Sequence, residues 1–193
     1  MSLSNPFCEW KRCATLRQND IDGFLSAGID IISLVQSYDG SGLAVARDRI
    51  VAHPEKRRFE FSRFSRGAFL DISAFILVAL DREGEIADLV AFRGGENAFA
   101  GSWLGRIGLL GEEQLDRARD ELRVHADVLS WLRAGRQGVV VIDPVRAAPM
   151  LRDAGSMVVG SWEEKRRLAD MLSVRLPPIA VEATVPTARV GVA

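Results

Sequence analysis

The segment from position 49 to position 66 mixes basic and aromatic side chains in a way that could bind nucleic acid. It contains six lysines and arginines, two glutamates and three phenylalanines. Basic side chains neutralise phosphates and exposed aromatic rings stack on unpaired bases, so this composition predicts a single-stranded nucleic acid as the partner. The residues predicted to bind it are Arg57, Arg58, Arg63, Arg66, Phe59 and Phe64.

The same segment has a second interpretation, as an ordinary strand with one buried face. Phe59 and Phe61 alternate with Arg58, Glu60 and Ser62, so the two rings would point into the core and the polar side chains toward solvent. The glycines that accompany the aromatic residues of the common RNA-recognition sheet are also missing. The sequence alone leaves both interpretations open.

Two aspartates form a second candidate site. Asp143 follows the apolar run from Gly138 to Ile142, at the position where α/β proteins place metal ligands and catalytic carboxylates. Asp88 lies in phase with Ile86 and Val90, so it should point toward packed surface. If the two carboxylates met, they could share a Mg²⁺ ion and act on a phosphate ester. In the structural alternative, Asp143 forms a turn before proline and Asp88 binds backbone or an arginine.

The order of predicted elements in the C-terminal half resembles the toprim module of primases and topoisomerases. An antiparallel hairpin is followed by a glycine-rich segment and by a strand, helix, strand and helix in succession. The resemblance implies magnesium-dependent chemistry on phosphate esters. The toprim pattern also has a glutamate after its first strand and an Asp-x-Asp after a later one, whereas Met157 to Ser161 contains no acid.

The remaining motifs lack diagnostic spacing. Cys8 and Cys13, with only His53 and His125 to complete a set, match no common zinc finger. No Gly-Lys-Ser or Gly-Lys-Thr of a phosphate-binding loop occurs, and the serine in the sequence from Gly101 to Gly105 is second rather than third, unlike a nucleophile elbow. We therefore predict no resident metal or cofactor, except Mg²⁺ in the enzyme alternative.

The elements that would position these residues begin with a central hairpin. Apolar runs at 74–80 and 86–92 flank the polar linker Asp81-Arg82-Glu83-Gly84, which predicts a β-hairpin. Further strands are predicted at 29–36, 43–52 and 58–62, although Leu43, Arg47 and Ile50 suit a helix face almost as well. The predicted fold class is α+β, with an antiparallel sheet of about five strands.

The second half of the chain predicts helices and a small C-terminal βαβα extension. The glycine-rich segment 93–111 is interpreted as a hinge between the halves. Pro149 argues against a helix that starts at Pro144, so that helix is placed from about Ala148. Ser161 and Glu164 form a capping box before the best-marked helix. The predicted helices are 112–124, 128–134, one from about 148, and 162–172, and the predicted strands are 138–142 and 157–160. The two strands are expected to be parallel and to extend the antiparallel sheet.

Composition limits the function and the domain organisation. The chain has 25 Lys and Arg against 26 Asp and Glu, which excludes a globally basic nucleic-acid binder but not a local basic site. We predict an irregular segment at 1–18, one α+β domain at 19–176, and an extended or disordered tail at 177–193. Within the domain, the antiparallel sheet is expected at 29–92, the glycine-rich hinge at 93–111, and the helical and βαβα part at 112–176. No apolar run approaches the roughly 20 residues of a membrane span, and two cysteines favour a reducing cytoplasm.

The function predicted first is a non-catalytic binding or accessory protein with nucleic acid as its partner. One alternative is the metal-dependent enzyme that uses Asp88 and Asp143. The other is an interaction module that forms homo-oligomers through an exposed sheet edge.

Overall fold

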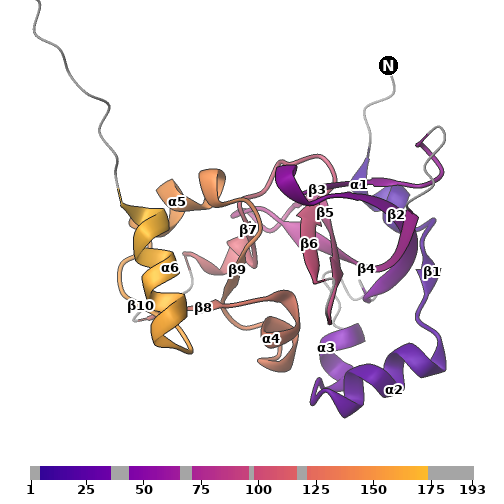
Figure 1. The fold of residues 1–193 in the computed structure, drawn as a ribbon, viewed down its shortest axis with the longest axis horizontal. Helices are drawn as coiled ribbons and strands as arrows, with labels where there is room; N and C mark the ends of the chain where they lie inside the picture. The colour runs from indigo at the N-terminus through magenta and orange to yellow at the C-terminus, as the bar shows by residue number, and fades with distance from the viewer. Residues whose placement is uncertain (1–4, 36–43, 66–70, 96–97, 117–120, 174–193) are drawn as a thin grey trace, which may run out of the picture.

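The first half of the chain forms a closed β-barrel. The computed structural model describes residues 5–35, 44–65, 71–95, 98–116 and 121–173. Five strands pair in the order β2-β3-β6-β5-β4, and β4 pairs back with β2 to close the circle (Figure 1). The strands are β2 (Ala46–His53), β3 (Arg58–Phe61), β4 (Asp71–Leu80), β5 (Ile86–Arg93) and β6 (Phe99–Ser102), and a short β1 (Ala14–Thr15) pairs with the start of β2. The mixed α+β class is confirmed, but the sheet is a barrel rather than an open sheet.

The barrel interior follows from alternation along each strand. In the antiparallel β2–β3 pair, Ile50 lies opposite Phe61 and Ala52 lies opposite Phe59. Phe61 is fully buried and packs edge to face against Trp103, with ring centroids 5.4 Å apart. The predicted hairpin of β4 and β5 is confirmed, and Gly84 at its turn has the positive φ of 84° that a short hairpin requires. The only parallel pair among these five strands joins β3 to β6, at Arg58 and Ser102.

The second half of the chain forms a four-stranded sheet in the order β10-β8-β9-β7. Its strands are β7 (Leu109–Leu110), β8 (Leu122–His125), β9 (Val139–Val141) and β10 (Met157–Val158). β8 is parallel to both β9 and β10, while β7 is antiparallel to β9. The predicted C-terminal strands are therefore parallel, but β8 lies between them and they belong to a sheet of their own.

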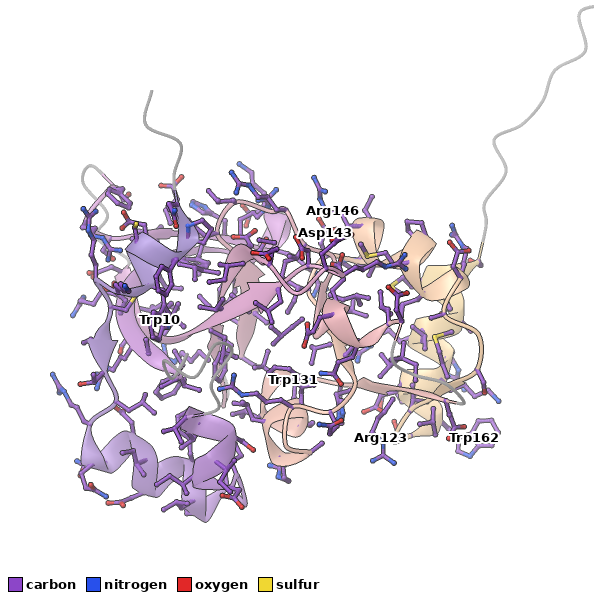
Figure 2. The ribbon with its side chains drawn as sticks, turned by 180° about the vertical axis from the view of Figure 1, so that it is seen from behind. Trp10, Arg123, Trp131, Asp143, Arg146 and Trp162 are labelled. Atoms are coloured by element: carbon purple, nitrogen blue, oxygen red, sulfur yellow. The ribbon has the colours of Figure 1, made fainter. Side chains whose placement is uncertain are left out.

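Helices cover both faces of this second sheet. α5 (Pro144–Arg152) and α6 (Trp162–Leu172) pack on one face through residues such as Leu151 and Leu168. The other face packs, together with α4 (Val128–Arg133), against the outside of β4 and β5. Trp131 of α4 lies in this junction, 4% exposed (Figure 2). The shared core joins the barrel to the second sheet.

Short N-terminal helices complete the barrel. α1 (Pro6–Trp10) packs on β4 and β5, and Trp10 donates a hydrogen bond of 3.2 Å from Nε1 to the carbonyl of Ala44. α2 (Gln18–Ser26) adds Phe24 to the shared core, α3 (Ile31–Val35) adds Leu34, and Ile29 between the two helices is also part of it. The remaining helical elements are the 3₁₀ turns η1 (Pro54–Lys56) and η2 (Glu112–Gln114). None of the helices in the described ranges has the length and apolar character needed to cross a membrane.

Two predicted elements are wrong because a local signal for the observed structure competed with the pattern on which the prediction was based. The strand predicted at 29–36 is helix α3, since the Asp30 side chain accepts a hydrogen bond of 2.9 Å from the amide of Ile32 and starts a helical turn; residue 36 lies outside the described ranges. The helix predicted at 112–124 is a 3₁₀ turn followed by strand β8. Leu122 and Val124 are buried while Arg123 is exposed, so a strand period was mistaken for a helical one.

The helix predicted from about Ala148 begins instead at Pro144. Asp143 caps it by accepting hydrogen bonds from the amides of Val145 and Arg146, and Pro149 lies inside it. Pro144 occupies the first helical position, where a backbone amide would have no acceptor within the helix, so proline loses no hydrogen bond there. The acceptor that Pro149 cannot use is the carbonyl of Val145, a residue 84% exposed, where water can satisfy it.

Barrel closure also bears on the oligomer hypothesis. Each of the five barrel strands has a hydrogen-bonded neighbour on both sides, so the open edge expected for an antiparallel sheet is not available there. Self-association stays a prediction, without that edge as its mechanism.

Candidate functional site

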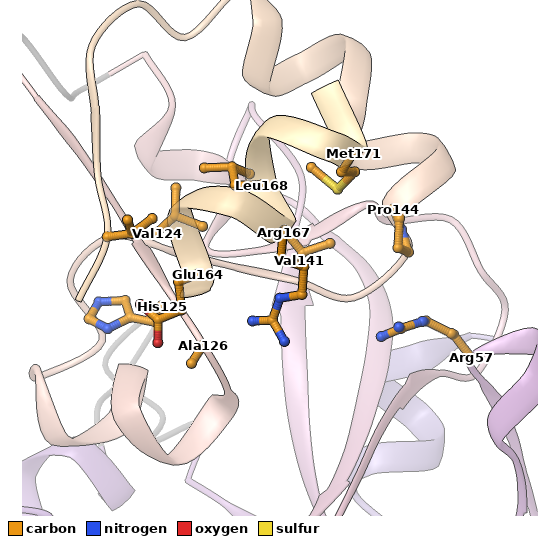
Figure 3. A pocket seen from close by; sticks show the side chains of 11 residues that line it. Arg57, Val124, His125, Ala126, Val141, Pro144, Glu164, Arg167, Leu168 and Met171 are labelled. Carbon is orange, nitrogen blue, oxygen red and sulfur yellow. The ribbon is translucent and has the colours of Figure 1, made fainter. Parts of the chain in front are cut away.

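A pocket of about 170 Å³ opens where the barrel meets the second sheet and α6 (Figure 3). Its polar and charged side chains are Arg57, His125, Glu164 and Arg167. Its apolar wall consists of Val124, Ala126, Val141, Pro144, Val159, Leu168 and Met171. These residues come from a barrel turn, from β8 and β9, from the segments that follow β8 and β10, and from helices α5 and α6. No single stretch of sequence therefore contains the site.

Arg57 is held in place by an unusual backbone. It ends the turn η1 with φ of 52° and ψ of 44°, in the left-handed region that residues other than glycine rarely adopt. Its amide bonds the carbonyl of Pro54 at 3.1 Å, and its carbonyl accepts from the amide of Ser102 at 3.0 Å. A Cβ on Gly101 would lie 2.9 Å from the carbonyl atoms of Arg57, so glycine is required at that position for the approach. Strain of this kind is concentrated at functional sites.

Arg167 reaches the pocket from α6. Glu164, Arg167, Leu168 and Met171 share one face of this helix because residues three and four apart are neighbours on a helix surface. The predicted capping box is confirmed: the Glu164 carboxylate accepts from the amides of Gly160 at 2.7 Å and Ser161 at 3.1 Å, so it already has partners.

Both arginines line the pocket, and neither has a carboxylate partner among the described residues. Figure 3 shows the guanidinium group of Arg57 entering the pocket from the barrel and that of Arg167 entering it from α6. Within the described ranges, no carboxylate oxygen lies within 4 Å of Arg57 or Arg167, whereas Arg47, Arg49 and Arg63 all have acidic partners. Guanidinium groups bind carboxylate and phosphate oxygens by paired hydrogen bonds. The arrangement can therefore hold an anion between the barrel and α6.

His125 lies at the other end of the pocket. Its Nε2 is 2.7 Å from the carbonyl of Gln137. A carbonyl oxygen only accepts hydrogen bonds, so Nε2 must be the nitrogen that carries the proton. In the neutral ring, Nδ1 is then unprotonated and can accept a hydrogen bond.

Of the residues predicted to bind nucleic acid, those that the structure describes do not form one surface. Arg57 enters the pocket, while the guanidinium of Arg58 lies over Gly105, where a Cβ would be 1.5 Å from Cζ. Phe59 is 1% exposed, so its assignment as a base-stacking residue is wrong. Phe64 is 52% exposed and keeps an accessible ring. Arg66 lies outside the described ranges.

Arg63 belongs to a network of ion pairs. It binds Glu9 at 2.8 Å and also pairs with Asp48. Its guanidinium carbon lies 3.9 Å from the centroid of the Phe61 ring and 5.1 Å from that of Phe64. Two carboxylates already neutralise this side chain, so a phosphate would have to compete with them.

The two candidate catalytic aspartates have structural partners. Asp88 is fully buried and accepts hydrogen bonds from the amides of Leu89, Leu104 and Arg106 at 2.7 to 2.9 Å. Burial raises the pKa of Asp88, and the three amide donors act in the opposite direction. This carboxylate fixes the loop that follows β6.

Asp143 fixes the far end of the loop that follows β6, through its backbone amide rather than its carboxylate. Its backbone amide binds the carbonyl of Gly108 at 3.0 Å, and its carboxylate caps α5 and lies 3.9 Å from Arg146 (Figure 2). Within the part of the chain that the structure describes, no three His, Cys, Asp or Glu side chains are grouped to hold a metal ion.

Sequence reasoning missed Arg167. The available signal was the spacing of Glu164, Arg167, Leu168 and Met171 along a helix that was correctly predicted. The pattern shows that these side chains share a face, but only the packing of α6 shows that the face closes a pocket opposite Arg57.

The two cysteines are expected to differ in reactivity. Burial, with Asp48 nearby, raises the pKa of Cys13 to about 12, so its thiol stays protonated at neutral pH, whereas Cys8 is exposed. Because the thiolate is the reactive form, Cys13 should react at least about 100-fold more slowly with iodoacetamide at pH 8 than Cys8. Mass spectrometry of peptides from timed alkylation measures both rates, and Cys8→Ser gives the rate of Cys13 alone. Equal rates in the folded protein would contradict the burial of Cys13.

No protein-family model, curated protein or solved structure shows a significant match to this chain.

Proposed function

We propose that this protein is a non-catalytic binding protein whose ligand places an anionic group between Arg57 and Arg167. One observation carries the proposal: two guanidinium groups from opposite halves of the molecule enter one pocket, and no described carboxylate lies within 4 Å of either. Like charges that enter the same pocket repel, and an anion bound by both replaces repulsion with two attractive contacts. Such a ligand would also connect the barrel to α6.

The chemistry of the lining favours binding over catalysis. Among the residues that the structure describes, those that line the pocket include no serine, threonine, cysteine, lysine or tyrosine that could act as a nucleophile. Glu164 is occupied by two backbone amides, and His125 is oriented by a backbone carbonyl. Each of these two side chains already has a structural role.

Titration calorimetry with small carboxylates, phosphate and sulfate tests the proposal. Arg57→Gln and Arg167→Gln should each weaken anion binding roughly tenfold, because each removes a charge-assisted hydrogen bond, and the double variant should abolish it. Both arginines are solvent-exposed, so the affinity should also fall as the salt concentration rises.

Arg166→Gln is the matched control. Arg166 is exposed and adjacent to Arg167 on α6 but does not line the pocket, so its removal changes net charge equally and should leave binding unchanged. An equal loss in Arg166→Gln and Arg167→Gln would mean that the anions respond only to overall charge. The absence of binding by any anion at low salt would refute the proposal.

Nucleic acid remains the second candidate partner, because Arg57 is adjacent to Arg58 in the chain and the ring of Phe64 is accessible. An oligonucleotide bound on the barrel would lose affinity in Arg57→Gln, Arg58→Gln and Phe64→Ala but not in Arg167→Gln. Fluorescence anisotropy with short single-stranded oligonucleotides at low and physiological salt measures this pattern. If Arg167→Gln were the one variant to lose affinity, the barrel surface would not be the binding site of the oligonucleotide.

A further inference from the structure

We infer that the ligand of this pocket is a small monocarboxylate with an apolar body, an inference that rests on the proposed function of the pocket. The two arginines provide the site for the head group. The remaining question is the charge, size and polarity of the rest of the molecule, and the pocket restricts all three.

The charge of the lining favours a single negative charge on the ligand. Arg57 and Arg167 carry two positive charges, and Glu164 carries one negative charge, so the lining has one net positive charge when His125 is neutral. A monocarboxylate neutralises the pocket, whereas a phosphate dianion would leave it negative and would lie close to the Glu164 carboxylate. A planar carboxylate also matches the fork of a guanidinium group.

The wall beyond the arginines is apolar. Figure 3 shows Leu168 and Met171 on the side of the pocket away from the two guanidinium groups, and Val141 beside Arg167. Val141, Leu168 and Met171 are partly buried and pack against the core between the second sheet and its helices. A ligand that follows this wall removes apolar surface from water on both molecules.

The volume limits the apolar body to a few carbon atoms. The pocket has a volume of about 170 Å³, close to that of a cavity that encloses benzene, about 150 Å³. Sites for drug-sized ligands have volumes of about 300 to 1,000 Å³. A nucleotide therefore exceeds this pocket, while a carboxylate with about four to seven further carbon atoms fits it.

A series of straight-chain carboxylates from acetate to decanoate tests the inference by titration calorimetry. Affinity should rise about fourfold with each added methylene while the chain extends along the apolar wall, and should then stop rising when the pocket is full. The alcohol of the same length as the best acid should bind far more weakly, because it cannot neutralise the arginines.

Two kinds of variant separate the head-group site from the wall. Arg167→Gln should weaken all the acids by the same factor and leave the dependence on chain length unchanged. Met171→Ala should leave acetate unchanged and reduce the gain per methylene, and Leu168→Ala provides a second wall variant if Met171→Ala does not fold. The melting temperature of each variant without ligand reports whether it is folded.

The outcomes distinguish the inference from the proposed function beneath it. If no carboxylate, phosphate or sulfate binds, both are wrong. If phosphate or sulfate binds through the two arginines while the carboxylates show no dependence on chain length, the pocket binds anions but the inferred ligand class is wrong. A rise with chain length that Met171→Ala removes supports the inference.

Discussion

Asp88→Ala is expected to lower the free energy of unfolding by about 3–5 kcal/mol. The Asp88 carboxylate accepts from two amides in the loop after β6, those of Leu104 at 2.8 Å and Arg106 at 2.9 Å, and from the amide of Leu89. Hydrogen bonds to an ionised group contribute about 1.5–3 kcal/mol each, and alanine would leave these donors without an acceptor. Denaturant unfolding followed by circular dichroism measures the change.

Asp88→Asn separates the loss of hydrogen bonds from the loss of volume. In the native protein Oδ1 accepts from Leu89 and Leu104, and Oδ2 accepts from Arg106. An asparagine can keep one oxygen in place, but its amide group then meets a backbone donor, so we expect a smaller cost of about 1–3 kcal/mol. Asp88→Ala should therefore lower the free energy of unfolding by more than Asp88→Asn does.

The same variants test the enzyme hypothesis. If Asp88 is a magnesium ligand, Asp88→Asn should abolish Mg²⁺ binding with little effect on stability. If it is the structural carboxylate that its three amide partners indicate, Asp88→Asn should lose stability and should not change Mg²⁺ titrations. A fully stable Asp88→Ala would refute the structural role.

Gly138→Ala is expected to destabilise the protein by about 3 kcal/mol or more. Gly138 has φ of 82°, and an added Cβ would lie 2.3 Å from the carbonyl oxygen of Arg123 in the adjacent strand β8. The glycine cannot shift easily, because its amide donates to Gln114 at 2.8 Å and its carbonyl accepts from Nε1 of Trp131 at 2.8 Å. The clash is with backbone, so no side-chain rotation relieves it.

Gly135→Ala is the matched control for this prediction. Gly135 also has a positive φ, of 66°, but an added Cβ would meet no atom within 4 Å. Its substitution should therefore cost only the backbone strain, about 1 kcal/mol. Thermal and urea unfolding of the two variants measures the difference, which isolates the contact with β8. Equal costs at the two positions would show that the contact is relieved by movement of the strands.

The sequence predicted those features whose signals lie within a few residues of one another. The hairpin of β4 and β5 followed from two apolar runs around a turn with glycine, and the start of α6 followed from the Ser161 and Glu164 capping box. The alternation of Phe59 and Phe61 with polar residues correctly indicated a strand with one buried face. In each case neighbouring side chains and local backbone geometry contain the information.

Local signals failed where a second period or a nearby cap competed with them. The isoleucines before position 36 favoured a strand, but the Asp30 carboxylate and the burial of Ile29 and Leu34 gave helix α3. Segment 112–124 contained both periods, and pairing with β9 and β10 made its end a strand. Tertiary packing overrides propensity in such segments, because burial contributes more than the small differences in propensity.

Barrel closure and the pocket were decided only by the tertiary structure. Closure depends on pairing β4 with β2 and β6 with β3, across long separations that no local pattern encodes. Arg57 and Arg167 are separated by most of the chain, and they meet because the core around Trp131 joins the barrel to the second sheet and α6 packs on the far side of that sheet. The sequence by itself determined the balance of charge and those strands and helices whose local pattern had no competing signal. Which charges face each other depends on long-range packing, and so only the fold could reveal the site.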